Sequence, residues 1–214
     1  MRPARASADF SHETDLAAAA GGPVAGLDEA GRGPWAGPVV AAAVILEADA
    51  IPEGLADSKT LSARRREALL AALEGQARIG IGVAEVAEID RLNILGAGDL
   101  AMLRALGDLG APPAAVLVDG NRLPGGLALP GRALVRGDAR ALSVAAASIA
   151  AKVTRDRIMA GLAAHHPGYG WERNMGYGTA EHRAALARLG VTPEHRRSFR
   201  PIHHILCEEA APRR

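Results

Sequence analysis

Two adjacent carboxylates, Asp28 and Glu29, end an apolar run and stand just before an arginine that is flanked by glycines. Buried carboxylates are costly, and in folded proteins they persist mainly where they are paired or hold a metal ion. The neighbouring guanidinium of Arg32 suits a phosphate group, because its planar donors match phosphate oxygens. This grouping indicates metal-assisted chemistry on a phosphate-bearing ligand.

Two further carboxylates, Asp119 and Asp138, stand at the expected ends of other strands. Carboxylates at several strand ends can converge in space. Hard divalent ions such as Mg²⁺ prefer oxygen ligands, and two ions about 3.5–4 Å apart can activate a water and stabilise a leaving oxygen in phosphodiester hydrolysis. Four acids would repel a phosphate without metal, so they favour an enzyme over a passive nucleic-acid binder.

The glycines around Arg32 do not form a dinucleotide-binding fingerprint. Residues 31–37 read G-x-G-x-x-x-G, one residue too long, and Pro38 then leads into another apolar run instead of a helix. The dinucleotide motif requires a strand, a glycine turn and then a helix N-terminus. We therefore expect a connection between two strands here, where glycines let the backbone approach a ligand closely.

The elements that must position these acids follow from the hydrophobic pattern. Three strands, followed by strands that alternate with helices, predict an α/β protein built on a mixed sheet. Ser62 and Ser143 are the expected N-caps of two helices. The expected strands are 24–28, 39–46, 77–86, 114–119 and 132–135, and the expected helices are 63–73, 90–109, 143–165 and 180–189.

The chain of 214 residues is long enough for one core domain and a small appendage. Residues 1–22, which end in two glycines, are expected to form a flexible N-terminal arm. Residues 23–166 are the expected catalytic core. Residues 167–214 are rich in Gly, His and Arg turns, and we expect a C-terminal helical appendage that completes a substrate groove.

Net charge is only +1, but it is unevenly distributed. Residues 1–130 carry 11 basic and 17 acidic residues, whereas residues 131–214 carry 14 and 7. An acidic catalytic part and a basic gripping part fit a metal-dependent nuclease, although solvated faces without a partner also produce such asymmetry. The single cysteine, Cys207, and the lack of a long apolar run predict a cytoplasmic protein without a membrane partner.

Seven stretches carry a family resemblance: DEAGRG (28–33), DSK (57–59), DGN (119–121), GD (137–138), SVAAASIAAKVTRD (143–156), GYGT (176–179) and HRRSF (195–199). In this order they resemble bacterial ribonuclease HII, the type 2 ribonuclease H family. The resemblance implies a ribonuclease H-like three-layer sandwich with a five-stranded mixed sheet. It also implies an endonuclease that hydrolyses the RNA strand of RNA/DNA hybrids and nicks on the 5′ side of ribonucleotides embedded in duplex DNA, leaving 3′-hydroxyl and 5′-phosphate ends.

The resemblance assigns roles to individual residues. It implies that Asp28, Glu29, Asp119 and Asp138 bind two Mg²⁺ or Mn²⁺ ions. It implies that a loop and a tyrosine read the 2′-hydroxyl of the ribonucleotide, which is the group by which a protein distinguishes RNA from DNA. The residues so assigned to substrate selection are Gly31, Arg32, Gly33 and Tyr177.

Other residues receive weaker assignments. Tyr169 lies in a similar Gly-Tyr-Gly setting and competes with Tyr177. Lys59 and Lys152 are candidate phosphate contacts, although Lys152 and Asp156 have the spacing of a helical ion pair. Arg155 and Arg157 are further phosphate candidates. The paired histidines do not have zinc-site spacing, and their roles stay open; they are His165, His166, His203 and His204.

Two alternative functions compete with this interpretation. A ribonuclease HIII usually carries an extra N-terminal substrate-binding domain, which the 23 residues before Val24 cannot supply. A catalytically silent hybrid-binding module would not need four acids. The expected partners are RNA/DNA hybrids and DNA duplexes that contain ribonucleotides, and the expected state is a monomer. A sliding clamp remains a possible partner, for which the C-terminus shows no defensible motif.

Two positions depart from the family pattern. Arg136 stands where a lysine is frequent, which keeps the charge. Met175 stands where a basic residue often precedes the Gly-Tyr pair, which removes one expected phosphate contact. Neither departure touches the four carboxylates.

Overall fold

A computed structural model describes residues 8–55, 58 and 61–210 of the chain. Five strands form one sheet in the order β3-β2-β1-β4-β5. Strand β1 pairs antiparallel with β2 and parallel with β4, and β4 pairs parallel with β5, so the sheet is mixed as expected. The strands are β1 (Val24–Ala30), β2 (Val39–Leu46), β3 (Ala77–Ala84), β4 (Ala115–Asp119) and β5 (Gly131–Leu134).

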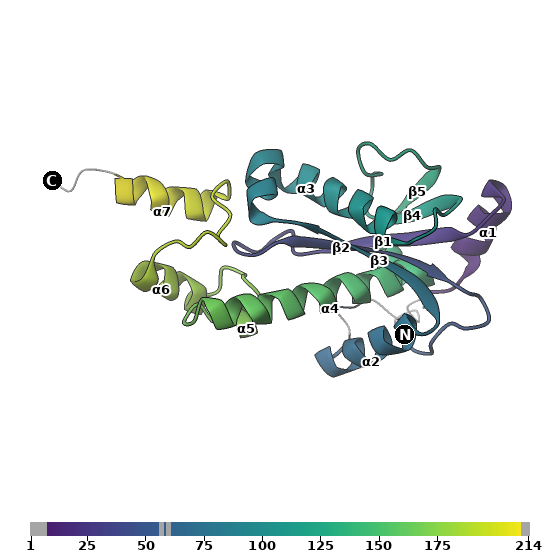
Figure 1. Cartoon of the computed structure of the whole chain (residues 1–214), viewed down its shortest axis with the longest axis horizontal. Coiled ribbons are helices and arrows are strands. Elements are labelled where there is room, and N and C mark those ends of the chain that lie inside the picture. Colours follow the sequence, from purple (N-terminus) through teal and green to yellow (C-terminus); the bar gives the residue numbers. More distant parts are fainter. Residues whose placement is uncertain (1–7, 56–57, 59–60, 211–214) are drawn as a thin grey trace, which may run out of the picture.

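Helices cover both faces of this sheet and make three layers (Figure 1). Helix α3 lies on one face, α4 and α2 lie on the other, and α5, α6 and α7 lie together beyond one end of the sheet. This arrangement confirms the expected α/β sandwich. The helices are α1 (Ser11–Ala20), α2 (Ala63–Glu74), α3 (Val86–Asp108), α4 (Leu142–His165), α5 (Trp171–Asn174), α6 (Ala180–Leu189) and α7 (Arg200–Ala210), with a short 3₁₀ helix at Gly137–Ala139.

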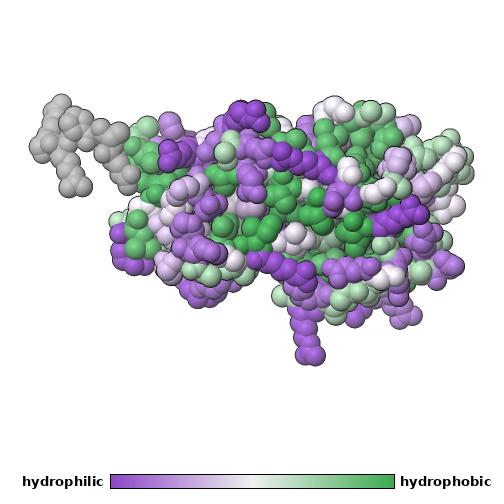
Figure 2. All heavy atoms as spheres, viewed as in Figure 1, coloured by the Kyte–Doolittle hydropathy of each residue, from purple (hydrophilic) through white to green (hydrophobic). Residues whose placement is uncertain are grey.

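Strand β2 is buried along its whole length because both of its faces are covered. Its alternate residues belong to two different clusters: Ala41 and Ala43 face α3, whereas Ala42 and Val44 face α4. A continuous apolar run is typical of a strand that is covered on both sides. Figure 2 shows hydrophobic atoms across the middle of the viewed face, between more hydrophilic outer helices.

The helical layers approach the sheet closely at glycines. A Cβ atom on Gly26 of β1 would lie 2.2 Å from the backbone carbon of Ser143 in α4. On the opposite face, a Cβ atom on Gly82 of β3 would lie 2.0 Å from the carbonyl oxygen of Ala101 in α3. These positions require glycine because backbone atoms already occupy the space of a side chain.

The N-terminal segment differs from the expected flexible arm over residues 11–20, which form helix α1. Its Leu16 is buried against Val24 of β1 and its neighbours. The buried carboxylate of Glu13 accepts a hydrogen bond of 2.7 Å from the backbone N–H of Ser143. Ser143 is therefore not the N-cap that the sequence predicted. The helix begins at Leu142, and a carboxylate from another helix satisfies one of its free N–H groups.

Helix α3 also starts earlier than expected. It begins at Val86, where the N–H of Glu85 donates to the side chain of Glu88 at 3.0 Å. Asn93 has φ 58° and ψ 173° and interrupts the helix, and its side chain accepts from the N–H groups of Leu95 and Gly96. An asparagine side chain can satisfy backbone donors in this way at the start of a new helical segment. Within the described residues, no helix is long and apolar enough to cross a membrane.

The segment from α5 to α7 packs on the end of α4 through a cluster that includes Met159, Trp171 and Ile202. Inside it, His182 accepts from the indole N–H of Trp171 at 3.1 Å and lies 3.0 Å from Nε2 of His195. The backbone N–H of Thr192 donates to Nδ1 of His195. Both imidazoles are fully buried, and these donors require them to be neutral.

We predict that this histidine pair makes the fold sensitive to acid. Burial, and then the nearby His182, lower the pKa of His195 from its ordinary 6.5 to about 4. Between these values the unfolded chain binds the extra proton, so the free energy of unfolding falls as the pH is lowered through this window. The loss from His195 should reach about 3 kcal/mol.

Urea unfolding between pH 7 and pH 4 measures this effect. His195→Gln should show a shallower pH dependence than the parent protein, whereas His165→Gln, at an exposed position of α4, should not. Equal slopes for the parent and His195→Gln would contradict the assignment.

Candidate active site

Three of the four predicted carboxylates meet at one edge of the sheet. Strands β1 and β4 are parallel neighbours, and Leu27 pairs with Val118. Asp28 and Asp119 are the next residues on these two strands, and Glu29 follows. The carboxyl ends of parallel strands lie at the same edge of a sheet, which explains why these acids come together.

The fourth carboxylate, Asp138, lies in the 3₁₀ helix after β5 and is buried. The same turn contacts Asp119, because the N–H of Gly137 donates to Asp119 Oδ1 at 2.7 Å. Arg136 adopts the left-handed conformation, φ 56° and ψ 46°, just before it. This turn therefore places Asp138 beside the end of β4.

Asp28 and Glu29 point to opposite faces of the sheet, as neighbours on a strand must. Asp28 pairs with Ala42, whose side chain faces α4, whereas Glu29 pairs with Ala41, whose side chain faces α3. Across the described ranges, no three Asp, Glu, His or Cys side chains are close enough to hold a metal ion as they stand. The carboxylates thus surround the end of β1 from two sides.

Burial and neighbouring charges make ionisation of two of these acids unfavourable. Burial, and then the charges of Glu29 and Asp119, raise the pKa of Asp28 well above its ordinary value. Burial also raises the pKa of Glu29, although Arg32 Nη1 lies 3.2 Å from its Oε1 and opposes the shift. Carboxylates that share a site repel one another unless a cation is bound between them.

A groove of about 330 Å³ opens beside these acids. The loop of Gly31, Arg32 and Gly33 forms one wall, and the exposed ring of Tyr177 lies against Gly33, since a Cβ atom there would be 3.3 Å from the ring. The structure therefore brings together the four residues expected to select substrate. Tyr169, the competitor, is buried and donates to the carbonyl of Gly190.

The lysine candidates have different outcomes. Lys152 lines the groove, where it can meet a phosphate, and its Nζ lies 2.6 Å from Oδ1 of Asp156. The expected helical ion pair is therefore present, and the side chain also lies at the groove. Lys59 lies outside the described residues. Arg157 forms an ion pair with Glu67 of α2 at 2.5 Å.

Arg155 does not contact solvent as a phosphate ligand would. Its side chain is buried, and its guanidinium donates to the carbonyl oxygens of Ala36, Pro38 and Met175. The expectation of a phosphate contact is wrong for this residue, because its guanidinium is occupied by carbonyl groups, two of which, on Ala36 and Pro38, lie 119 and 117 residues away in sequence.

Sequence reasoning gave no role to two serines at the groove. Ser58 and Ser148 share a hydrogen bond of 2.8 Å, and Ser148 also hydrogen-bonds the carboxylate of Asp28. Both lie within stretches that resemble the family, which was the only available signal. Of the paired histidines, His165 contacts the carbonyl of Gly161 and His203 contacts Cys207, and neither lies at the groove.

Comparison with known proteins decides the family. The sequence profile of ribonuclease HII matches residues 25–204. The chain belongs to the ribonuclease HII family. Its sequence is 64% identical over 186 residues to the ribonuclease HII of Paracoccus denitrificans, covering 87% of this chain and 89% of that protein. Members of this family are endonucleases with ribonuclease H activity on RNA/DNA hybrids, and this chain is therefore such an enzyme.

Solved structures agree with the ribonuclease HII fold. Ribonuclease H2 from Pyrococcus horikoshii has a TM-score of 0.74 and 27% identity, covering 87% of this chain and 98% of that one. The ribonuclease HII of Archaeoglobus fulgidus, solved in complex with PCNA, has a TM-score of 0.71 and 26% identity, covering 85% and 96%. Bst-RNase HIII in complex with Mn²⁺ shares the fold at a TM-score of 0.66 and 19% identity, covering 88% and 70%.

Proposed function

We propose that this ribonuclease HII nicks the phosphodiester bond on the 5′ side of ribonucleotides, both in RNA/DNA hybrids and within duplex DNA. Asp28, Glu29, Asp119 and Asp138 hold two Mg²⁺ or Mn²⁺ ions, and the products carry 3′-hydroxyl and 5′-phosphate ends. The observation that supports this most strongly is that Asp28, Glu29 and Asp119 line one open groove at the sheet edge, with Asp28 buried.

The donor set suits a hard divalent cation. All four candidate ligands are carboxylates, and Mg²⁺ and Mn²⁺ prefer such oxygen donors. Because the fold holds Asp28 and its neighbours where their charges repel, a bound cation would relieve a cost that the protein otherwise carries. When bound, two such ions supply an activated water and stabilise the leaving oxygen.

The chain's own residues prepare this site. The hydrogen bond from Gly137 N–H orients Asp119, and Ser148 with the N–H of Glu29 orients Asp28. These contacts hold the carboxylate oxygens in place before substrate arrives, which reduces the reorganisation needed during the reaction. Arg32 partly balances the charge of Glu29 at the mouth of the groove.

In this proposal, the Gly31–Gly33 loop and Tyr177 select the ribonucleotide. The backbone of Gly31, Arg32 and Gly33 and the ring of Tyr177 face the same groove as Asp28. Glycines allow a close approach to the ribose, and a 2′-hydroxyl can both donate and accept a hydrogen bond. Lys152, and Lys59 as predicted from sequence, would contact backbone phosphates.

Several broader expectations stay predictions. They are the monomeric state, the cytoplasmic location, the division at residues 22 and 166, and completion of the groove by residues 167–214. A sliding clamp also stays a possible partner.

Cleavage of a labelled DNA duplex that holds one ribonucleotide tests the proposal. We expect one nick on the 5′ side of the ribonucleotide with Mg²⁺ or Mn²⁺, no nick with a chelator, and no cleavage of the matched all-DNA duplex. A long RNA/DNA hybrid serves as the positive control. Cleavage of the hybrid without a nick at the single ribonucleotide would contradict the finer proposal and leave the ribonuclease H assignment intact.

A further inference from the structure

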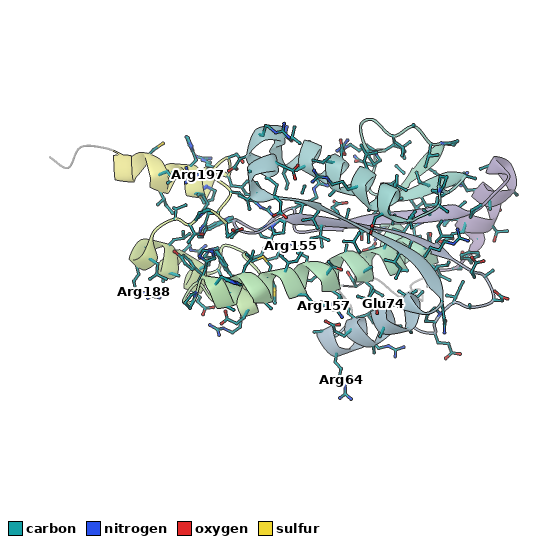
Figure 3. The ribbon with its side chains drawn as sticks, in the orientation of Figure 1. Arg64, Glu74, Arg155, Arg157, Arg188 and Arg197 are labelled. Carbon is teal, nitrogen blue, oxygen red and sulfur yellow. The ribbon has the colours of Figure 1, made fainter. Side chains whose placement is uncertain are left out.

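Two arginines are almost fully buried behind the loop that borders the groove. Arg196 is 0% exposed and Arg155 is 1% exposed. Arg155 comes from α4 and lies between that helix and the sheet (Figure 3), whereas Arg196 comes from the segment between α6 and α7. Buried guanidinium groups are rare unless they are hydrogen-bonded. The groups that these two arginines bind therefore indicate which part of the structure they hold in place.

Arg196 binds the loop of residues 31–38 through backbone carbonyl groups. Its Nη2 donates to the carbonyl of Gly31 at 2.6 Å and to that of Pro38 at 3.2 Å. Its Nη1 donates to the carbonyl of Arg32 at 3.1 Å, and its Nε donates to that of Gly37 at 2.9 Å. One side chain therefore fixes both ends of the loop.

Arg155 extends this connection to the tyrosine. It donates to the carbonyl of Pro38 at 3.0 Å, to that of Ala36 at 3.2 Å and to that of Met175 at 3.0 Å. Met175 lies two residues before Tyr177. The two arginines thus join the loop and the turn that carries the tyrosine into one unit.

The direction of these carbonyl groups determines what the loop presents to the groove. In a planar trans peptide, the C=O and the following N–H point in opposite directions. The described residues contain no cis peptide. Since the carbonyls of Gly31 and Arg32 turn inward to Arg196, the N–H groups of Arg32 and Gly33 turn away from it. Both of these residues line the groove, where their N–H groups can donate to a ligand.

The arrangement carries an electrostatic cost. Burial, and then the charge of Arg155, lower the pKa of Arg196, and burial lowers that of Arg155. Two apolar side chains would fill the space without bringing like charges together. What they could not do is donate hydrogen bonds to the loop carbonyls.

We propose that Arg196, assisted by Arg155, is a positioning residue for ribonucleotide selection. It holds the N–H groups of Arg32 and Gly33 toward the ribose. With Arg155, it also fixes the position of the turn that carries Tyr177 relative to these N–H groups. This inference rests on the proposed function, because it assumes that the loop and the tyrosine read the 2′-hydroxyl. Arg196 itself does not line the groove, so it acts through the loop.

The test measures how strongly the protein prefers a duplex with one ribonucleotide over an all-DNA duplex. This preference is a ratio of two Kd values, so it does not depend on the fraction of protein that is folded. In an Asp28→Asn background with Mg²⁺, the Kd for an all-DNA duplex is divided by the Kd for the same duplex with one ribonucleotide. Arg196→Lys keeps the positive charge but cannot reach the loop carbonyls with a planar fork. We expect this ratio to fall about tenfold, the equivalent of one to two lost hydrogen bonds. Arg155→Lys should act in the same direction.

Arg64→Lys is the matched control. Arg64 is exposed on α2 and points away from the body of the protein (Figure 3), so its replacement should leave the ratio unchanged. A loss of folded protein would raise both Kd values by the same factor and leave the ratio as it was. Hydrogen exchange adds a second readout: amides of residues 31–38 should exchange faster in Arg196→Lys, while those of residues 24–27 keep the parent rate.

The outcomes separate the two proposals. A ratio near one for the protein with Arg196 intact would refute ribonucleotide reading itself. A large ratio that stays unchanged in Arg196→Lys, with unchanged loop exchange, would overturn the positioning role alone. A reduced ratio with faster loop exchange supports it.

Discussion

Replacing Asp28 by Asn should reduce phosphodiester cleavage by roughly 10³-fold or more, because a metal-bound carboxylate contributes several kcal/mol of transition-state stabilisation. The same replacement should stabilise the folded protein. The raised pKa of Asp28 means that its charged form destabilises the native state at neutral pH, and an uncharged amide removes this cost. The amide oxygen can still accept from the N–H of Glu29.

Steady-state cleavage and thermal unfolding, the latter in chelator, measure the two effects together. The gain in Tm should be present at pH 7 and should vanish below about pH 4, where Asp28 is protonated in both the folded and the unfolded chain. Glu74→Gln, at an exposed position of α2, is the control and should alter neither property. Undiminished cleavage by purified Asp28→Asn would remove the basis of the metal proposal.

Replacing Gly26 by Ala should lower the free energy of unfolding by about 3 kcal/mol, near the upper end for overpacked cores. The new Cβ atom would lie 2.2 Å, 2.4 Å and 2.5 Å from backbone atoms of Ser143 and Val144. Backbone cannot move aside as a flexible side chain can. Helix α4 must therefore shift from β1, and it would carry Ser148 and Lys152 away from Asp28.

Urea unfolding of this variant is compared with Gly161→Ala, the same substitution in α4 itself. A Cβ atom on Gly161 meets nothing within 4 Å, and alanine favours a helix over glycine, so that variant should gain up to about 1 kcal/mol. The opposite signs distinguish the close approach from a general effect of alanine. A gain in stability from Gly26→Ala would contradict the contact geometry described above.

The sequence predicted the central elements because their signals are local. Strand β2 is a continuous apolar run that leaves no alternative, and α2 begins after Ser62, whose side chain accepts from the N–H of Arg65. Asp28 and Asp119 stood out for the same reason, since each directly follows an apolar run. Local patterns thus identified the sheet and three of its covering helices, whereas the role of the four carboxylates stays a prediction.

The errors occurred where a distant residue decides the local structure. Helix α1 looked like an arm because its stability comes from the burial of Leu16 and from the contact of Glu13 with Ser143, 130 residues away. Arg155 looked like a phosphate ligand because arginines on helices are usually exposed. Its carbonyl partners on the loop lie 117 and 119 residues away, and a single sequence does not pair them.

The hydrogen bonds from Arg196 to the loop have a consequence for how the enzyme matures during synthesis. Arg32 and Arg196 are separated by 164 positions, and the four carboxylates are all translated before Arg196, whose guanidinium hydrogen-bonds the loop of residues 31–38. A nascent or truncated chain that ends before Arg196 holds every acid but lacks the arginine that donates to the carbonyls of Gly31, Arg32 and Gly37. In the positioning role proposed above, discrimination of ribonucleotides is therefore acquired only once Arg196 has been translated, later than the four acids, and proteolysis that removes the segment holding Arg196 would eliminate discrimination while leaving the acids in place.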